Sequence, residues 1–473
     1  MGPHRYSWMT VEELAPRIWS GELEVVELVE ETLEGIRKHN PRLKAFITVL
    51  EERARSRAAD LSRELKAGIY RGPLHGIPVA VKDIVAVEGV PMTAGSRILR
   101  GEVPARSAEV VRALESAGAV IVGTTNLHEF ASGATNVNPH FGMPANPWKE
   151  GRVPGGSSGG SAVSVAAGLV PLAVGTDTSG SVRLPSALCG VVGLKPSYPA
   201  VSRDGVFPLA PSLDTVGFHA LSVWDTAAAL SKTTSSPELA QRSDPFRLPS
   251  SVGSAVRLGY LRSWVEGNAD PEVERAAESF VRELEAKGFE VVEAELSDHE
   301  LFRRYWYFIR RAEASEVHEH WVLERPEDYG PDVRRMLEEG LRIRAVDYVR
   351  AMRMREILRD AVESVLRKLD ALVLPASPIT APEADLTKVE VGGREVDVYS
   401  ALLSFTMPFN LTGHPAIVLP YTFSSEGLPI SMQLVGRYMR DHELLAVALA
   451  VERTLDLKRR FKELRVRTSV PSS

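Results

Sequence analysis

The sequence has few features that cross-link a chain or anchor it in a membrane. Its 473 residues include one cysteine, Cys189, which excludes an intramolecular disulfide and fits a reducing compartment. Residues 1–17 lack the apolar core of a secretory signal peptide. The longest apolar-leaning stretch, 162–175, is rich in small residues and too short to span a bilayer. We therefore expect a cytoplasmic protein with no membrane partner.

An excess of basic residues is also lacking. Lys and Arg number 56 against 62 Asp and Glu, which gives a formal net charge of −6. Nucleic-acid-binding proteins commonly carry a basic surface, so composition alone argues against DNA or RNA as the main partner. The contents of 44% hydrophobic and 25% charged residues are those of an ordinary globular protein.

The chain is long enough for a large buried core, and its pattern predicts a layered α/β architecture. Residues 1–70 read as helical, with a capping box from Thr10 to Glu13, and we expect this segment to pack on the core formed by 71–473. Neither repeats nor a clear linker occur, so one large domain is expected. The main predicted elements are helices at 25–39, 45–66, 107–117, 271–287, 303–324, 348–369 and 441–455, and strands at 77–85, 119–122, 256–261, 289–296, 372–375, 416–420 and 431–435.

Two segments rich in glycine and serine, together with an upstream lysine, carry the chemistry. Residues 155–161 read GGSSGGS and 175–183 read GTDTSGSVR, while Lys82 ends the apolar run GIPVAVKD at 76–83. Ser181 follows small residues whose backbone N–H groups can converge on one point, as an oxyanion requires. A serine hydroxyl is a weak nucleophile without a base.

Lys82 is the candidate base, since no histidine stands in a recognisable triad motif. Burial among Ile77, Val79 and Val81 would disfavour its charged form. Lowering its pKa from about 10.4 to about 7–8 costs roughly 4 kcal/mol, which a large buried site can supply. Because a hydroxyl both donates and accepts, Ser157 can relay a proton between the other two residues.

Three other interpretations of the glycine-rich segments compete with catalysis. Such stretches are often flexible linkers, but 162–170 continues directly as an apolar helix-like segment. A phosphate-binding loop lacks its Gly-Lys-Ser/Thr ending here. Residues 155–159 satisfy the Gly-x-Ser-x-Gly nucleophile elbow, yet 146–154 before them are not a strand. A non-catalytic ligand-binding protein remains an alternative from another class.

At these residues the chain resembles the amidase signature family. The resemblance is strong over 72–217, returns at 372–375 and 410–416, and is weak over 223–344. It implies an α/β/α domain with a mixed sheet flanked by helices, and a triad of Ser181 as nucleophile, Ser157 after a cis peptide bond as relay, and Lys82 as base. It further implies that no metal or cofactor is needed and that backbone amides form the oxyanion hole, namely those of Thr178, Ser179, Gly180 and Ser181.

Two flanking charged residues are interpreted as supports of the nucleophile loop. We expect Asp177 and Arg183 to fix that loop through charge-assisted hydrogen bonds, without acting as acid or base. Cys189 reads as an inert buried thiol. His318 and His320 are too poorly spaced on a helix to share a metal. The Arg-rich stretch 342–359 reads as a solvated helix face.

The resemblance leaves two branches of the family open. One hydrolyses free-standing amides to acid and ammonia or amine, and it is the main prediction. The other is the A subunit of the tRNA-dependent amidotransferase, which releases ammonia from glutamine for partner subunits and would bring a tRNA partner. Those A subunits usually carry Gln and Asp where this chain has Leu184 and Leu403, whereas Arg355 keeps the second branch open as a candidate for a substrate carboxylate. A homodimer is expected on frequency alone.

Overall fold

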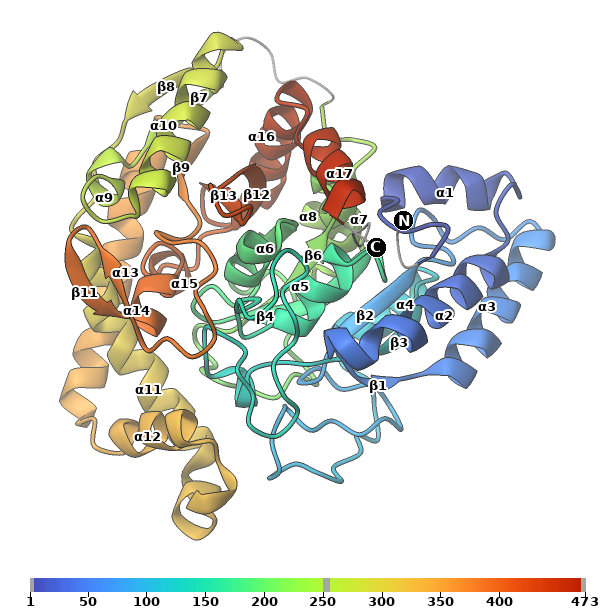
Figure 1. The fold of residues 1–473 in the computed structure, drawn as a ribbon, viewed down its shortest axis with the longest axis horizontal. Coiled ribbons are helices and arrows are strands. Elements are labelled where there is room, and N and C mark those ends of the chain that lie inside the picture. Colours follow the sequence, from blue (N-terminus) through green and yellow to red (C-terminus); the bar gives the residue numbers. More distant parts are fainter. Residues whose placement is uncertain (1–3, 250–255, 469–473) are drawn as a thin grey trace.

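A mixed β-sheet of eleven strands forms the centre of the molecule (Figure 1). The computed structural model describes residues 4–249 and 256–468, so small parts of both expected regions lie outside it. Parallel pairs join β2 to β3 and β4, and β7 to β8 and β9, while the other neighbours are antiparallel. The predicted fold, with a central mixed sheet flanked by helices, is confirmed.

The strands of this sheet follow one another in space in the order β1 (Phe46–Val49), β3 (Val120–Thr125), β2 (Pro78–Lys82), β4 (Leu172–Asp177), β6 (Thr215–Ala220), β5 (Val192–Lys195), β12 (Ala416–Phe423), β13 (Pro429–Val435), β9 (Ala371–Pro375), β7 (Arg257–Tyr260) and β8 (Glu290–Glu293). A separate hairpin consists of β10 (Lys388–Val391) and β11 (Arg394–Asp397). The sequence predicted the sheet strands after residue 255 but not this hairpin.

Helices surround the sheet (Figure 1). They are α1 (Val11–Trp19), α2 (Val25–Leu43), α3 (Glu51–Lys66), α4 (Glu109–Ser116), η1 (Glu129–Ala131), α5 (Gly159–Ala166), α6 (Arg183–Cys189), α7 (Val223–Thr233), α8 (Pro237–Arg242), α9 (Arg262–Val265), α10 (Pro271–Ala286), α11 (His299–Glu324), η2 (Pro326–Asp328), α12 (Pro331–Gly340), α13 (Ala345–Leu366), α14 (Val398–Leu403), α15 (Met407–Leu411), α16 (Asp441–Thr454) and α17 (Leu457–Thr468).

Two helix pairs cover the middle strands from opposite faces. Helices α5 and α6 pack on each other, and α6 packs on β5, β12 and β13. Helices α7 and α16 also pack on each other, and they contact β5, β6, β12 and β13. Because strands buried on both faces are rich in apolar residues, β2, β4 and β6 consist mainly of apolar and small residues, with polar side chains concentrated toward their ends.

The first seventy residues are helical only in part. The capping box of α1 is present, since the Thr10 hydroxyl accepts from the Glu13 amide at 3.1 Å and the Glu13 carboxylate accepts from the Thr10 amide at 2.8 Å. The prediction of a helix over 45–66 is wrong at its start, where β1 pairs antiparallel with β3 at the sheet edge. Gly123 on β3 permits this pairing, because a Cβ there would collide with the Thr48 carbonyl oxygen. Strand pairing at a distance of about 75 residues in sequence thus overrides local helix propensity.

The sheet brings together the ends of two neighbouring parallel strands. Lys82 is the last residue of β2 and Asp177 the last of β4, and the two strands pair with Val81 opposite Val174. Every residue of both strands is buried. In open α/β sheets, ligands commonly bind beyond the carboxyl ends of the strands, which places the candidate residues where a site is expected.

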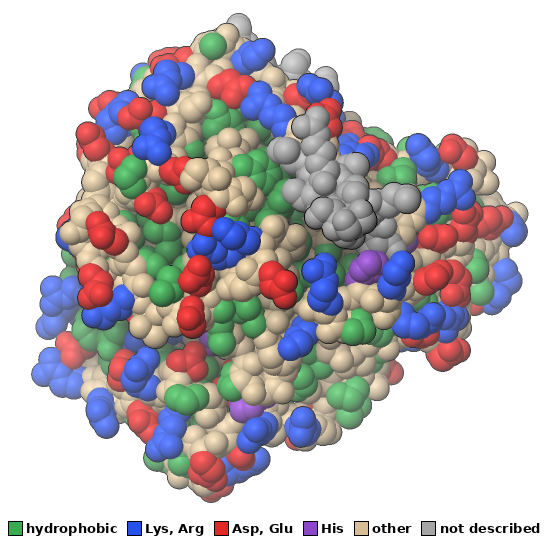
Figure 2. Space-filling model, viewed as in Figure 1, with side chains coloured by type: hydrophobic (Ala, Val, Ile, Leu, Met, Phe, Trp, Pro, Cys, Tyr) green, Lys and Arg blue, Asp and Glu red, His purple; other side chains and the backbone are tan. Residues whose placement is uncertain are grey.

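The molecular surface carries mixed charge. Figure 2 shows Lys and Arg interspersed with Asp and Glu over the face that it presents, with hydrophobic side chains in scattered groups. Among the helices of the described residues, none is long and apolar enough to cross a membrane.

Candidate active site

The amine of Lys82 is buried in the candidate site and forms hydrogen bonds with two hydroxyl groups. Its Nζ is 2.8 Å from Ser157 Oγ and 2.8 Å from Thr176 Oγ1. The side chain is fully buried and pairs with no carboxylate in the part of the chain that the structure describes. Burial lowers the pKa of the Lys82 amine from 10.5 to about 7, against the opposing charges of Asp177 and Asp214. A neutral amine, able to accept a proton, is therefore accessible near neutral pH.

Ser157 belongs to the loop that leads into α5. The peptide bond between Gly156 and Ser157 is cis, as the family resemblance implied. The next residue ties this loop to the second glycine-rich segment, since the Ser158 amide donates to the Ser181 carbonyl oxygen at 3.2 Å. The Ser158 hydroxyl also donates to the Thr176 carbonyl at 3.1 Å. The two segments singled out in the sequence are thus joined in space.

Ser181 lies just before α6, with a side chain that is 4% exposed. Within residues 4–249 and 256–468, its hydroxyl makes no hydrogen bond. The hydrogen-bonded chain expected from the sequence is therefore formed between Lys82 and Ser157 and open between Ser157 and Ser181. The backbone contact through Ser158 holds the two serines in neighbouring positions.

Three backbone amides beside Ser181 are available to a developing oxyanion. The amides of Thr178, Ser179 and Ser181 donate to no acceptor among the residues that the structure describes. The amide of Gly180, also predicted as a donor, already has an acceptor in the structure. It donates to the Asp177 carboxylate at 2.8 Å and is committed to holding the turn.

The turn itself requires glycine at position 180. Gly180 has a φ of 135°, a conformation that L side chains rarely adopt. A Cβ there would also collide with the Thr406 hydroxyl, which donates to the Ser179 carbonyl oxygen at 2.7 Å. The close approach of Thr406 thus fixes the shape of the turn before Ser181.

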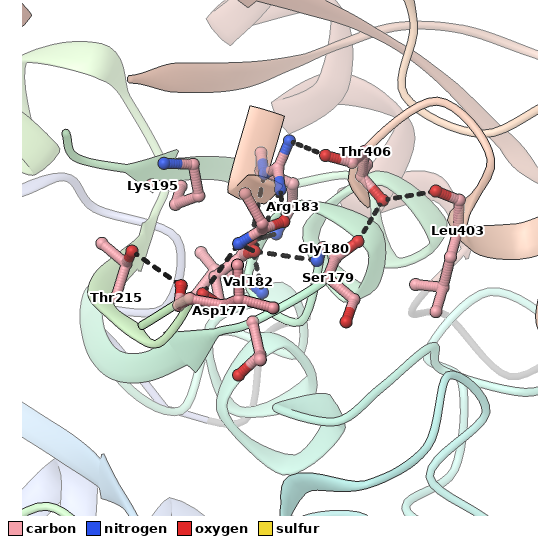
Figure 3. A network of polar contacts seen from close by, with 12 residues as sticks. Asp177, Ser179, Gly180, Val182, Arg183, Lys195, Thr215, Leu403 and Thr406 are labelled. Atoms are coloured by element: carbon pink, nitrogen blue, oxygen red, sulfur yellow. Dashed lines mark hydrogen bonds and ion pairs between the residues drawn. The ribbon is translucent and has the colours of Figure 1, made fainter. Parts of the chain in front are cut away.

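A fully buried ion pair fixes the same turn (Figure 3). Arg183 donates through Nε and Nη2 to the two carboxylate oxygens of Asp177, each at 3.0 Å. The carboxylate also accepts from the amides of Gly180, Val182 and Arg183. Burial alone would raise the pKa of the Asp177 carboxyl, but the charge and hydrogen bonds of Arg183 hold it well below its usual range. The pairing predicted from the sequence is present.

The same guanidinium reaches across to the C-terminal third of the chain. Arg183 Nη1 donates to the Thr406 carbonyl at 2.9 Å and to Gln433 Oε1 at 2.6 Å, and Nη2 donates to Asn410 Oδ1 at 2.6 Å. Asn410 in turn donates to Asp177 Oδ1 at 2.8 Å. Figure 3 shows Arg183 between Asp177 and Thr406, with Lys195 directed away from them.

Sequence reasoning missed two residues of the site. Thr176, the second partner of Lys82, precedes Asp177 on β4, and strand alternation could have placed it on the opposite face from that residue. Asp214 accepts from the Thr178 hydroxyl at 2.6 Å and from the amides of Leu209 and Ala210. A lone aspartate before a strand carries no sequence signal of that contact.

A cavity of about 490 Å³ adjoins the loop that hydrogen-bonds to Gly156, although Lys82, Ser157 and Ser181 are not among its lining residues. Residues 132–135, next to the Ser157 loop, line one side, while α11, α12 and α14 line the others. The middle and C-terminal segments, where the family resemblance is weak, therefore form most of its wall. Leu403 lies in that wall, at the position where A subunits usually carry aspartate.

Several residues set aside in the sequence lie outside the site. Cys189 is buried, and its thiol donates to the Pro154 carbonyl at 3.3 Å. His318 is buried against the Tyr329 hydroxyl, whereas His320 is exposed beside Glu324, so the two imidazoles have separate surroundings.

Arg355 does not line the cavity. Its Nε donates to the Leu411 carbonyl at 2.8 Å, and its guanidinium lies over the Tyr198 ring. The structure gives no support to its suggested role with a substrate carboxylate.

Comparison with known proteins identifies the family. The amidase family model matches residues 27–445. The chain belongs to the amidase family. The resemblance drawn from the two signature segments and the lysine segment is thereby confirmed.

Relatives of this amidase-family chain include both branches considered above. It is 35% identical over 480 residues to the A subunit of the glutamyl-tRNA(Gln) amidotransferase of Picosynechococcus sp., covering 93% of this chain and 97% of that protein. A crystal structure of an amidase matches with a TM-score of 0.87 and 36% identity, covering 94% and 99% of the two chains. A third match has a TM-score of 0.89 and 34% identity, and it covers 94% of this chain and 98% of the other. It is a chain from a structure described as a vestigial protein complex that reveals the evolutionary origins of an s-triazine catabolic enzyme.

The Asp177–Arg183 pair predicts a large loss of stability when one partner is removed. Arg183→Met leaves a buried carboxylate without its counter-charge, and we expect the free energy of unfolding to fall by about 3–5 kcal/mol. Denaturant unfolding followed by circular dichroism measures this value. The control is Arg334→Met, which removes an exposed partner of Glu338 and should cost less than about 1 kcal/mol. Equal losses in the two variants would show that the buried pair does not anchor the turn.

Proposed function

We propose that this chain is a serine amidase that hydrolyses a carboxylic amide to the acid and ammonia or an amine. The observation that carries the proposal is the buried Lys82 amine, which has hydroxyl partners and no carboxylate partner among the described residues. Membership of the amidase family supports the same reaction class. In this proposal Ser181 is the nucleophile, Ser157 the relay and Lys82 the base.

The proposed reaction proceeds through an acyl-enzyme. The Ser181 hydroxyl rotates toward Ser157 and attacks the amide carbonyl carbon, while its proton passes through the Ser157 hydroxyl to the Lys82 amine. The negative charge on the carbonyl oxygen is held by the free amides of Thr178, Ser179 and Ser181. The C–N bond then breaks, and the leaving nitrogen takes the proton back along the same path.

Water completes the cycle. A water molecule gives a proton to the neutral Lys82 through Ser157 and attacks the ester that Ser181 now carries. The bond between the acyl carbon and the Ser181 oxygen then breaks, the proton returns from Lys82 through Ser157 to that oxygen, and the acid is released. Asp177 and Arg183 take no proton in this sequence, since their proposed role is to hold the turn.

A second candidate function is the A subunit of a tRNA-dependent amidotransferase. The 35% identity to a protein of that name favours it, and it would bring partner subunits. Two residues argue against it, because Leu184 and Leu403 replace the glutamine and aspartate that A subunits usually carry.

Covalent labelling tests the nucleophile. We expect a phosphonofluoridate to label Ser181, since an activated serine attacks phosphorus as it attacks a carbonyl. Peptide mass mapping locates the adduct, and Ser181→Ala should lose it. The control variant is Ser364→Ala, which removes an exposed hydroxyl of α13 and should keep the label. Label on a different serine, or none, would refute the assignment.

The pH dependence of acylation tests the base. Protonated Lys82 cannot accept a proton, so we expect kcat/KM to rise with pH and reach half its plateau near the pKa of about 7. The rise should extend from about pH 6 to about pH 8 and vanish in Lys82→Met, whose residual rate is at least about 100-fold lower.

Lys195 supplies the control for this profile. Burial also lowers the pKa of its amine to about 7, but its Nζ donates to the Pro196 carbonyl, away from the two serines. Lys195→Met should therefore keep the pH profile of the wild type. A profile that persists in Lys82→Met and disappears in Lys195→Met would overturn the choice of base.

Partner dependence separates the two candidate functions. For a free-standing amidase, we expect the isolated chain to hydrolyse simple aliphatic or aromatic amides at rates that added partner subunits and tRNA do not change. Ammonia release from a panel of amides, including glutamine, measures this. Glutamine hydrolysis that appears only with amidotransferase partner subunits and tRNA would favour the amidotransferase branch instead.

A further inference from the structure

Arg310 is a buried arginine in the wall of the cavity beside the candidate triad. It lies in the middle of α11 and its side chain is 1% exposed. Its Nη2 donates to the carbonyl oxygen and the hydroxyl of Ser132, at 3.2 and 3.0 Å. These are the hydrogen bonds of its guanidinium to the described residues, and both involve one nitrogen.

The remaining nitrogens of Arg310 have no protein acceptor. Nε and Nη1 are buried and unpartnered, and no described carboxylate forms an ion pair with the guanidinium. The rings of Trp306 and Tyr399 lie about it, each with its centroid 5.5 Å from the guanidinium carbon. Its neighbour Arg311, in contrast, pairs with Glu339 at 3.0 Å. A buried cation without an acceptor is costly, so a site that keeps one is built for a missing partner.

The unpaired guanidinium is connected to both glycine-rich segments. One turn before it on α11, Trp306 Nε1 donates to the Thr178 carbonyl at 3.4 Å, next to the free amides. On the other side, the segment that begins with Ser132 continues to Ala134, whose carbonyl accepts from the Gly156 amide at 2.6 Å. A molecule in the cavity with one end at Ser181 would therefore have Arg310 within its surroundings.

We propose that Arg310 binds a carboxylate of the substrate, so that the enzyme acts on amides that carry a second, anionic end. The inference rests on the proposed amidase function and names the substrate class of that site. A carboxylate supplies the missing counter-charge and accepts hydrogen bonds from the free nitrogens. The planar, permanently charged guanidinium suits this role better than an amine does. The flanking aromatic rings exclude water and strengthen the attraction.

The experiment uses the full-length chain and two matched substrate series. One series consists of the monoamides of linear dicarboxylic acids with three to six carbons, and the other of their methyl esters, which differ by the lost charge. We expect the wild type to prefer the anionic member at one or more chain lengths. Arg310→Met should lower kcat/KM for that substrate about 100-fold, mainly through KM, and change the value for its ester less than about threefold. Arg310→Lys should restore part of the loss, since it returns charge without the planar donors.

Arg304→Met is the control, because Arg304 lies on the same helix, is exposed and does not line the cavity. It should leave the preference for the anionic substrate intact. Equal loss on both series in Arg310→Met would assign Arg310 to holding Ser132 and would overturn the inference. A wild type that prefers the esters at every length would overturn it as well, while the amidase function stands. No turnover of any amide together with no label on Ser181 would instead refute the proposed function.

A binding measurement covers the case in which Arg310→Met does not fold. We expect calorimetry with the wild type to show that dicarboxylates bind more tightly than monocarboxylates of equal length, and that Arg310→Lys reduces the difference at least tenfold. Equal affinity of the two acid classes for the wild type would contradict the inference.

Discussion

The arrangement of the site depends on one buried pair of opposite charges. The Asp177 carboxylate accepts hydrogen bonds from three backbone amides of the turn that contains Ser181. The Arg183 guanidinium neutralises this carboxylate, and each side-chain nitrogen of Arg183 donates to an acceptor. Because neither charge is left without partners, the cost of removing them from water is offset. The pair thereby fixes the turn whose amides at Thr178, Ser179 and Ser181 have no acceptor among the described residues.

Two other buried basic side chains, Lys82 and Arg310, have different surroundings and consequently different chemistry. Lys82 faces hydroxyl groups that neither supply a counter-charge nor repel a neutral amine, so burial brings its pKa to about 7. Burial also lowers the pKa of Arg310, but a guanidinium starts so high that it stays charged. The Lys82 amine can thus exchange a proton near neutral pH, whereas the Arg310 guanidinium is a permanent positive charge.

The sequence predicts the parts of the structure that have local signals. The order of strands and helices, the capping box of α1 and the contact of Lys82 with Ser157 follow from periodicity, caps and motif resemblance. The predictions that the sequence could not make correctly concern contacts between residues whose positions depend on the folded structure. The segment of β1 was predicted as part of a helix, because the strand that pairs with it lies about 75 residues away in sequence. The hydrogen bond from the Gly180 amide to Asp177 likewise depends on the position of the Asp177 side chain, which the sequence does not give. The sequence also could not predict that two nitrogens of Arg310 lack an acceptor, because this depends on which residues the fold places around the guanidinium.

The contacts of Arg183 link the turn before α6 to residues that come much later in the chain. The two shortest hydrogen bonds of the Arg183 side chain, each 2.6 Å, go to Asn410 and Gln433. Gln433 lies 250 positions after Arg183 in the sequence. Asp177, by contrast, lies only six positions before Arg183. The turn before Ser181 therefore takes its contacts from two parts of the chain that are far apart in sequence. A chain cut before Gln433 would leave the buried Arg183 guanidinium without one of its acceptors, so the far end of the sequence contributes to the stability of a turn formed near residue 180.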